Sequence, residues 1–192
     1  MTNFRLLPGL PVYPPYARSF PFEWGTRGHE GTVVEFASGT GKWTGNFAPG
    51  SGELSTAVPH PDGRRVLVVA GGDIWMVDPD TETAEQVATS VVDLWRVGTP
   101  EGSVLNLQGL AFAHLGPTGI LWHTRRLSWD GFKDIEMIDA RLTGAAWSAV
   151  GPPEWVPFEV DLSTGRSTGG SFDVPGSLTG DWERLASDEG AT

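Results

Sequence analysis

The chain of 192 residues contains no cysteine. This absence excludes a disulfide framework, a zinc site built on thiolates and a cysteine nucleophile, and it is compatible with a reducing compartment. No stretch approaches the roughly 20 consecutive apolar residues of a membrane-spanning helix. Residues 1–8 also lack the uninterrupted apolar segment of a secretory signal. We therefore expect a cytoplasmic protein that does not contact a membrane.

Basic residues are few, with 13 Lys and Arg against 24 Asp and Glu, which gives a formal net charge of -11. Such a balance disfavours nucleic-acid backbones and anionic membrane surfaces as partners. An acidic surface suits either a basic protein partner or simple solubility, and the composition does not decide between them.

Spacings that would place several ligands on one metal are also lacking. The four histidines, His29, His60, His114 and His123, show no His-x-x-x-His, His-x-His or His-Glu-x-x-His pattern. The residues Asp78, Asp80 and Glu82 start like a calcium loop, but Thr83 and Thr89 stand where Gly and Glu are required. An Asx turn is the favoured interpretation, and we expect no metal and no cofactor.

Motifs of nucleophilic and phosphate chemistry are incomplete. Residues 39–43 imitate the end of a phosphate-binding loop, but the leading Gly is missing and Trp43 replaces the Ser or Thr that would hold magnesium. No serine lies in a Gly-x-Ser-x-Gly elbow between an expected strand and an expected helix, and Ser128 and Ser171 have no identifiable base. The sequence therefore favours a binding protein over an enzyme.

Glycine and proline, by contrast, are abundant, at 26 and 15 residues. Short apolar runs between such turn residues indicate β-strands. The runs cover 32–36, 43–47, 54–58, 65–70, 87–97, 119–126, 134–138, 142–149, 155–161 and 166–172. We predict a mainly β fold, an antiparallel meander that forms a sandwich or partly closed barrel, with little helix.

The strongest local signal is a β-hairpin between residues 61 and 78, in which Gly71-Gly72-Asp73 separates two apolar runs. This unit resembles one blade of a β-propeller. A propeller needs several such units, and no second copy recurs at a fixed period, so a sandwich is the preferred interpretation.

The predicted domain organisation has three parts. The first part is residues 1–24, in which the stretch 8–24 combines five prolines with five aromatic residues, and we expect an extended arm that packs on the domain. Residues 25–182 form a single β domain, in which residues 178–185 are the only plausible helix. Residues 183–192 form an acidic, frayed tail.

Three C-terminal segments, Arg126–Gly131, Phe158–Gly165 and Gly169–Phe172, resemble a pattern shared by uncharacterised bacterial proteins. The resemblance covers about the last 50 residues and, less closely, the region from Trp43 to Asp78. It implies a compact bacterial domain and brings no activity that could be assigned to these residues.

One cluster is the candidate ligand-binding site, because it gathers cations, indoles, an imidazole and a carboxylate within nine positions: Trp122, His123, Arg125, Arg126, Trp129 and Asp130. A guanidinium stacked on indole and paired with Asp130 could form a rim for an anion or a sugar. The same groups could instead form a structural pair across a turn, which is the more common outcome. Strand alternation would put Trp122, Thr124 and Arg126 on one face.

We thus predict a non-catalytic binding or accessory module whose acidic surface meets a basic protein, as in an immunity or inhibitor protein. The alternative is a small-molecule or carbohydrate-binding β-domain, or a weak hydrolase, that uses the cluster at 122–130. The sequence specifies neither the ligand nor the oligomeric state.

Overall fold

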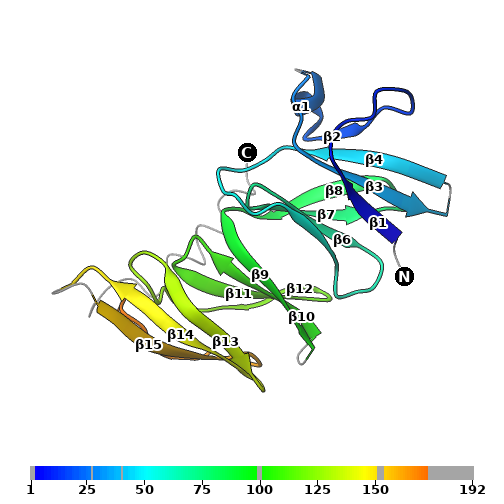
Figure 1. Cartoon of the computed structure of the whole chain (residues 1–192). Helices are drawn as coiled ribbons and strands as arrows, with labels where there is room; N and C mark the ends of the chain where they lie inside the picture. Colours follow the sequence, from blue (N-terminus) through cyan, green and yellow to red (C-terminus); the bar gives the residue numbers. More distant parts are fainter. Residues whose placement is uncertain (1–2, 27, 40, 99–100, 151–153, 173–192) are drawn as a thin grey trace, which may run out of the picture.

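The computed structural model describes residues 3–26, 28–39, 41–98, 101–150 and 154–172. These residues form sixteen strands and one short helix, α1 (Phe22–Thr26). The strands make four four-stranded sheets, which lie in a row in sequence order (Figure 1). The prediction of a mainly β, antiparallel fold with little helix is confirmed. The sheets are layered as in a sandwich, and the described residues form no closed barrel.

Each sheet uses a nearly continuous part of the chain. Sheet A contains, in spatial order, β1 (Asn3–Leu7), β3 (Thr32–Ser38), β4 (Gly41–Phe47) and β2 (Arg18–Phe20). Sheet B contains β5 (Thr56–Pro59), β6 (Val66–Ala70), β7 (Asp73–Asp78) and β8 (Thr83–Ala88). Neighbouring strands are antiparallel, except that β2 runs parallel to β4.

Sheet C contains β12 (Gly119–His123), β11 (Ala111–Gly116), β10 (Glu101–Leu107) and β9 (Val91–Gly98). Sheet D contains β13 (Phe132–Ile138), β14 (Arg141–Ser148), β15 (Glu154–Asp161) and β16 (Ser167–Gly169). Sheets B, C and D are therefore simple meanders, and the predicted hairpin is the β6–β7 pair.

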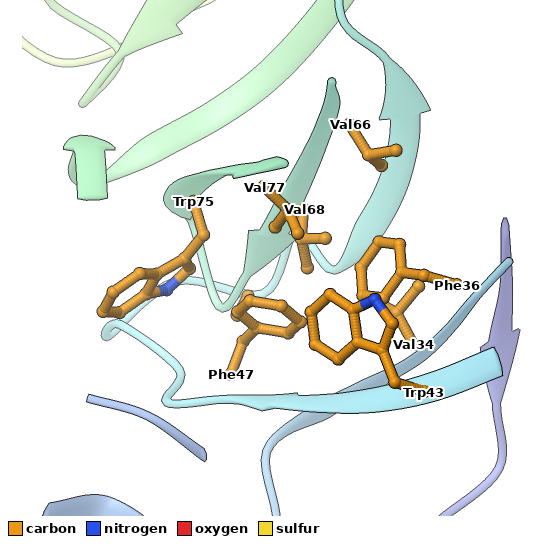
Figure 2. Packing of buried hydrophobic residues seen from close by; sticks show 9 residues of the cluster. Val34, Phe36, Trp43, Phe47, Val66, Val68, Trp75 and Val77 are labelled. Carbon is orange, nitrogen blue, oxygen red and sulfur yellow. The ribbon is translucent and has the colours of Figure 1, made fainter. Parts of the chain in front are cut away.

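A hydrophobic cluster holds each sheet against the next. Between sheets A and B, the rings of Phe36 and Phe47 lie against valines of β6 and β7 (Figure 2). The rings of Phe36 and Trp43 stack with centroids 4.6 Å apart, and the indole of Trp43 donates a hydrogen bond to the carbonyl of Pro79 at 2.9 Å. Burial of such large rings is the main force that joins two sheets face to face.

The two middle sheets are buried on both faces, and the sequence reflects this. In β6, Val66 and Val68 face sheet A, whereas Leu67 and Val69 face sheet C. In β10, Leu105 faces sheet B and Val104 faces sheet D. Because both faces of these strands are covered, they read as continuous apolar runs instead of alternating ones.

The four-stranded meander recurs three times, in sheets B, C and D, although the sequence shows no repeat. The reason is that the outer and middle sheets have different burial patterns, so equivalent strands need different residues. In sheet B, β6 is buried at all five positions, whereas β14 in sheet D is buried at only three of eight. A search for sequence periodicity therefore does not detect the backbone repetition.

Several strand predictions need correction. β1, β2, β10 and β11 were not predicted, and β12 ends at His123 instead of continuing to Arg126. The β10–β11 hairpin carries Asn106 and His114, which are buried despite their polarity and interrupt the apolar pattern. The predicted region 87–97 is divided between β8 and β9.

The N-terminal arm is partly helical and partly covers sheet A. Phe20 lies against Trp43 and Phe47, and Trp24 of α1 contacts the ring of His29. The side chains of Tyr13, Tyr16 and Phe22 are exposed. The predicted helix at 178–185 and the acidic tail at 183–192 lie outside the described residues. Within the described part of the chain, no helix has the length and apolar character needed to cross a bilayer.

Candidate functional site

The candidate cluster begins at the end of β12, where Trp122 belongs to the core between sheets C and D. Its indole nitrogen donates a hydrogen bond to the carbonyl of Leu162 at 2.9 Å. Thr124 is also buried, and its hydroxyl accepts a hydrogen bond from the amide of Phe112 at 2.9 Å. The side chains of Trp122 and Thr124 are therefore engaged in core packing and in hydrogen bonds to the main chain.

The two arginines follow in an irregular segment, and their guanidinium groups bind main-chain carbonyls. Arg125 donates to Gly169 at 2.7 Å and to Phe172 at 2.9 Å. Arg126 donates to Ser128 at 2.8 Å and to Trp129 at 2.9 Å. Because β12 has already ended, the strand alternation predicted for residues 122–127 is wrong beyond Thr124.

The predicted stacking of guanidinium on indole is present. The guanidinium carbon of Arg126 lies 5.6 Å from the ring centre of Trp129 and 4.2 Å from that of Phe172. The rings of Trp129 and Phe172 are themselves 4.7 Å apart. Asp130 is exposed, and the guanidinium groups bind carbonyls rather than this carboxylate. Arg125 therefore cross-links this segment to the end of β16 and to Phe172, whereas Arg126 closes the turn at 128–129 and stacks on the ring of Phe172.

The two serines considered as nucleophiles also bind main-chain groups. The hydroxyl of Ser128 donates to the carbonyl of Gly131 at 2.6 Å, and it accepts the amide of Asp130 at 3.2 Å. The hydroxyl of Ser171 donates to the carbonyl of Trp147. Both hydroxyls fix the connection between β12 and β13 to the end of β14.

The histidines are placed apart from one another. His60 and His114 are fully buried, and burial lowers the pKa of each below the ordinary value of 6.5. A hydrogen bond with the backbone of Leu162 opposes the effect of burial on the pKa of His114 and only partly offsets it. His29 contacts Trp24, and His123 is exposed. The described residues contain no group of three or more His, Asp or Glu side chains that could hold a metal ion.

The segment that imitates a calcium loop forms the predicted Asx turn. The carboxylate of Asp78 accepts the amides of Asp80 and Thr81 at 3.0 and 3.3 Å. It also pairs with Arg64 at 2.6 Å. Partial burial raises the pKa of Asp78, but the hydrogen bonds outweigh it and hold the pKa below the usual range.

A different surface, not predicted from the sequence, is the outer face of sheet D. Pairing of β14 with β15 places Trp147 beside Trp155, Ala145 beside Pro157 and Thr143 beside Glu159. In the flanking strands, Glu136 and Thr168 complete the row through Thr143 and Glu159. These residues share one face because side chains alternate along a strand. Polar and apolar side chains alternate only over residues 141–143 of this strand, so the sequence carries no clear sign of this face.

The centre of this face is a shallow hollow of about 600 Å³, lined by Asp134, Glu136, Thr143, Gly144, Ala145, Pro157, Phe158, Glu159, Thr168 and Gly169. Small residues form its floor and three carboxylates stand around it. Glu159 pairs with Arg141 at 2.5 Å, while Glu136 has no ion-pair partner within the described part of the chain. Lys133 lies with its ammonium 4.7 Å from the ring centre of Trp155.

No protein-family model matches the chain, and no curated protein matches it either. The resemblance to a bacterial sequence pattern therefore stays a prediction.

Proposed function

We propose that the protein is a non-catalytic, cytoplasmic binding or accessory module that recognises a basic protein, in the manner of an immunity or inhibitor protein. The observation that carries this proposal is the uneven distribution of charge. Residues 132–192 contain 11 acidic and 4 basic side chains, a formal charge of -7 out of the total of -11. This excess of negative charge in the C-terminal part of the sequence favours encounter with a positively charged partner.

The hydrogen bonds within the candidate cluster at 122–130 favour a partner-binding surface elsewhere on the protein. A site for an anion or a sugar needs guanidinium donors that point toward the ligand. Four of the donor groups of Arg125 and Arg126 are already directed at main-chain carbonyls. Ligand binding at this cluster would require these bonds to break, so the ligand-binding alternative has the weaker support.

The charge argument has a physical limit that the experiment must address. Net charge alone also keeps a protein soluble, and it acts within about 10 Å at moderate salt. A specific complex must therefore persist at salt concentrations that screen non-specific attraction. Its association rate should still fall as the salt concentration rises.

The decisive measurement is native mass spectrometry of the protein isolated from its own host at low and at moderate salt. We expect a complex with one basic protein, in a fixed ratio, that persists at moderate salt but assembles more slowly there. A lone chain at both salt concentrations would overturn the proposal, and a chain that carries a small-molecule mass would favour the ligand-binding alternative.

A further inference from the structure

The outer face of sheet D, at one end of the row, is not covered by any described element (Figure 1). Its apolar part includes the side chains of Trp155 and Ile138, which are 40% and 56% exposed. Ala145, Pro157 and Trp147 lie in the same two cross-strand rows. In stacked-sheet and repeat architectures a terminal unit normally has a polar outer face, so an apolar one indicates a contact surface.

Charged groups surround this apolar centre. Asp134, Glu136 and Glu159 line the hollow, with Thr143 and Thr168 between them. An apolar floor with a rim of one charge sign is typical of a protein interface. The rim here is predominantly negative, so it complements a positive surface.

An internal contact shows how the face accommodates a cation. The ammonium group of Lys133 lies over the indole of Trp155, although the Lys133 side chain is 45% exposed. Its only ion-pair partner among the described residues is Asp134, at the long distance of 4.0 Å. Because a cation–π contact prefers arginine over lysine, an incoming guanidinium is a suitable replacement for this ammonium.

We infer that the outer face of sheet D binds an arginine-bearing surface of the basic partner, with one guanidinium between Trp155 and the carboxylate of Asp134, where the Lys133 ammonium lies, and with Glu136 as a further carboxylate of the same face. This assignment rests on the proposed function and adds the surface and the recognised side chain. The planar guanidinium can bind a carboxylate with two parallel hydrogen bonds while its face lies on an indole.

Two other occupants are disfavoured by charge. In a two-fold dimer through this face, the carboxylates of one copy would oppose those of the other. Residues 173–192 carry five acidic residues and one basic residue, the same sign as the face. A basic partner is the occupant for which the charges are complementary.

The test uses the full, isotope-labelled chain and a decaarginine peptide as the probe, followed by NMR and by calorimetry at low salt. We expect the largest shifts at the amides of Thr143, Ala145 and Thr168 and at the Trp155 indole. Decalysine should bind more weakly, because an ammonium cannot make the paired hydrogen bonds.

A pair of double variants removes the effect of total charge. Asp134→Asn with Glu136→Gln should weaken decaarginine binding on the order of three- to tenfold. The control, Glu53→Gln with Glu85→Gln, removes the same charge from two exposed positions far from this face and should change binding less than twofold, as expected for screened charges. Both variants should fold, because all four side chains are exposed.

Each of the following results would overturn the assignment. Shifts spread evenly over all acidic surfaces, or equal weakening by the two double variants, would show only non-specific attraction. A change of the Trp155 signal on removal of residues 173–192 would identify that segment as the occupant. A concentration-dependent dimer abolished by Trp155→Ala would identify a second copy. A basic host partner that binds equally to the Asp134/Glu136 variant would leave the proposed function intact and reject this surface.

Discussion

Sheets A and D, at opposite ends of the row, differ in whether other described segments of the chain pack on their outer faces (Figure 1). On sheet A, Asn46 is only 1% exposed, and its amide group binds Ser19 of the N-terminal arm and the main chain of His29 and Gly31, just before β3. On sheet D, Thr143 lies in the corresponding central row beside an open hollow. One terminal sheet is therefore closed by its own chain, and the other presents an apolar and acidic surface.

The outer faces of sheets A and D also differ in how far their carboxylates are paired with cations. On sheet A, Glu35 lies between Arg5 and Lys42, at 3.0 and 3.1 Å. The hydrogen bonds from Lys42 and Arg5 hold the pKa of Glu35 below its usual value. On sheet D, Glu136 lacks such a neighbour in the described part of the chain. A face with neutralised charges serves as a cap, whereas excess charge of one sign leaves a face able to attract a partner.

The largest expected effect tests whether the buried rings of sheets A and D contribute equally to the free energy of unfolding. Phe47→Ala in sheet A and Phe158→Ala in sheet D should each lower the free energy of unfolding by about 3–5 kcal/mol, because both rings are buried between sheets. Urea unfolding followed by circular dichroism and by tryptophan fluorescence provides the measurement. Phe22→Ala, at a side chain 75% exposed, is the control and should have almost no effect. Two separate transitions would show that the ends unfold independently.

A smaller effect separates the closed face from the open one. Asn46→Ala should lower the free energy of unfolding by about 2–3 kcal/mol, because it leaves the amide of Gly31 and the carbonyl of His29 without partners. Thr143→Ala should change it by less than about 0.5 kcal/mol. Hydrogen exchange at the amide of Gly31 should accelerate only in the Asn46 variant. Equal costs at the two positions would contradict the distinction between the faces.

The attachment of β16 to the rest of sheet D should depend on Arg125. Arg125→Lys loses the paired bonds to Gly169 and Phe172, and should cost about 1 kcal/mol. Exchange of the Gly170 amide, which binds the carbonyl of Pro157, should accelerate. Arg141→Lys is the matched control, because its ion pair with Glu159 is exposed and should contribute little. An unchanged Gly170 exchange rate in Arg125→Lys would argue against the cross-linking role.

The smallest expected effect is a pH dependence of stability caused by His114, which lies in sheet C. Burial lowers the pKa of His114 in the folded state, so below about pH 6.5 the unfolded chain binds a proton that the folded chain does not. Stability should therefore fall as the pH is lowered through this value, by at most about 1.4 kcal/mol per pH unit for one group. His114→Phe should flatten the dependence, as measured by urea midpoints between neutral and mildly acidic pH. Parallel curves for the variant and the original chain would contradict this assignment.

The sequence predicted the local elements wherever one simple pattern applied. The β6–β7 hairpin was predicted correctly because two apolar runs are separated by Gly71 and Gly72, and both glycines adopt positive φ angles. The turn at Asp78 was predicted because Asp, Pro and Thr form turns by local hydrogen bonds. The β10–β11 hairpin was missed because its buried Asn106 and His114 satisfy no simple apolar pattern.

The candidate site was predicted less well, for a different reason. The sequence correctly brought Arg126 and Trp129 together, since residues close in sequence can stack across a turn. It did not show that the carbonyls of Gly169 and Phe172, more than 40 positions away, would take the donors of Arg125. Nor did it show that Trp147 and Trp155 would be neighbours, because strand register is a long-range property.

The amino-acid sequence by itself determined the mainly β character, the turns and the excess of negative charge, because these depend on composition and on neighbouring residues. Only the tertiary structure decided which strands are covered on both faces, that the N-terminal arm packs on sheet A, and that no described element covers the outer face of sheet D. The physical reason is that burial and surface exposure depend on contacts between segments far apart in the chain.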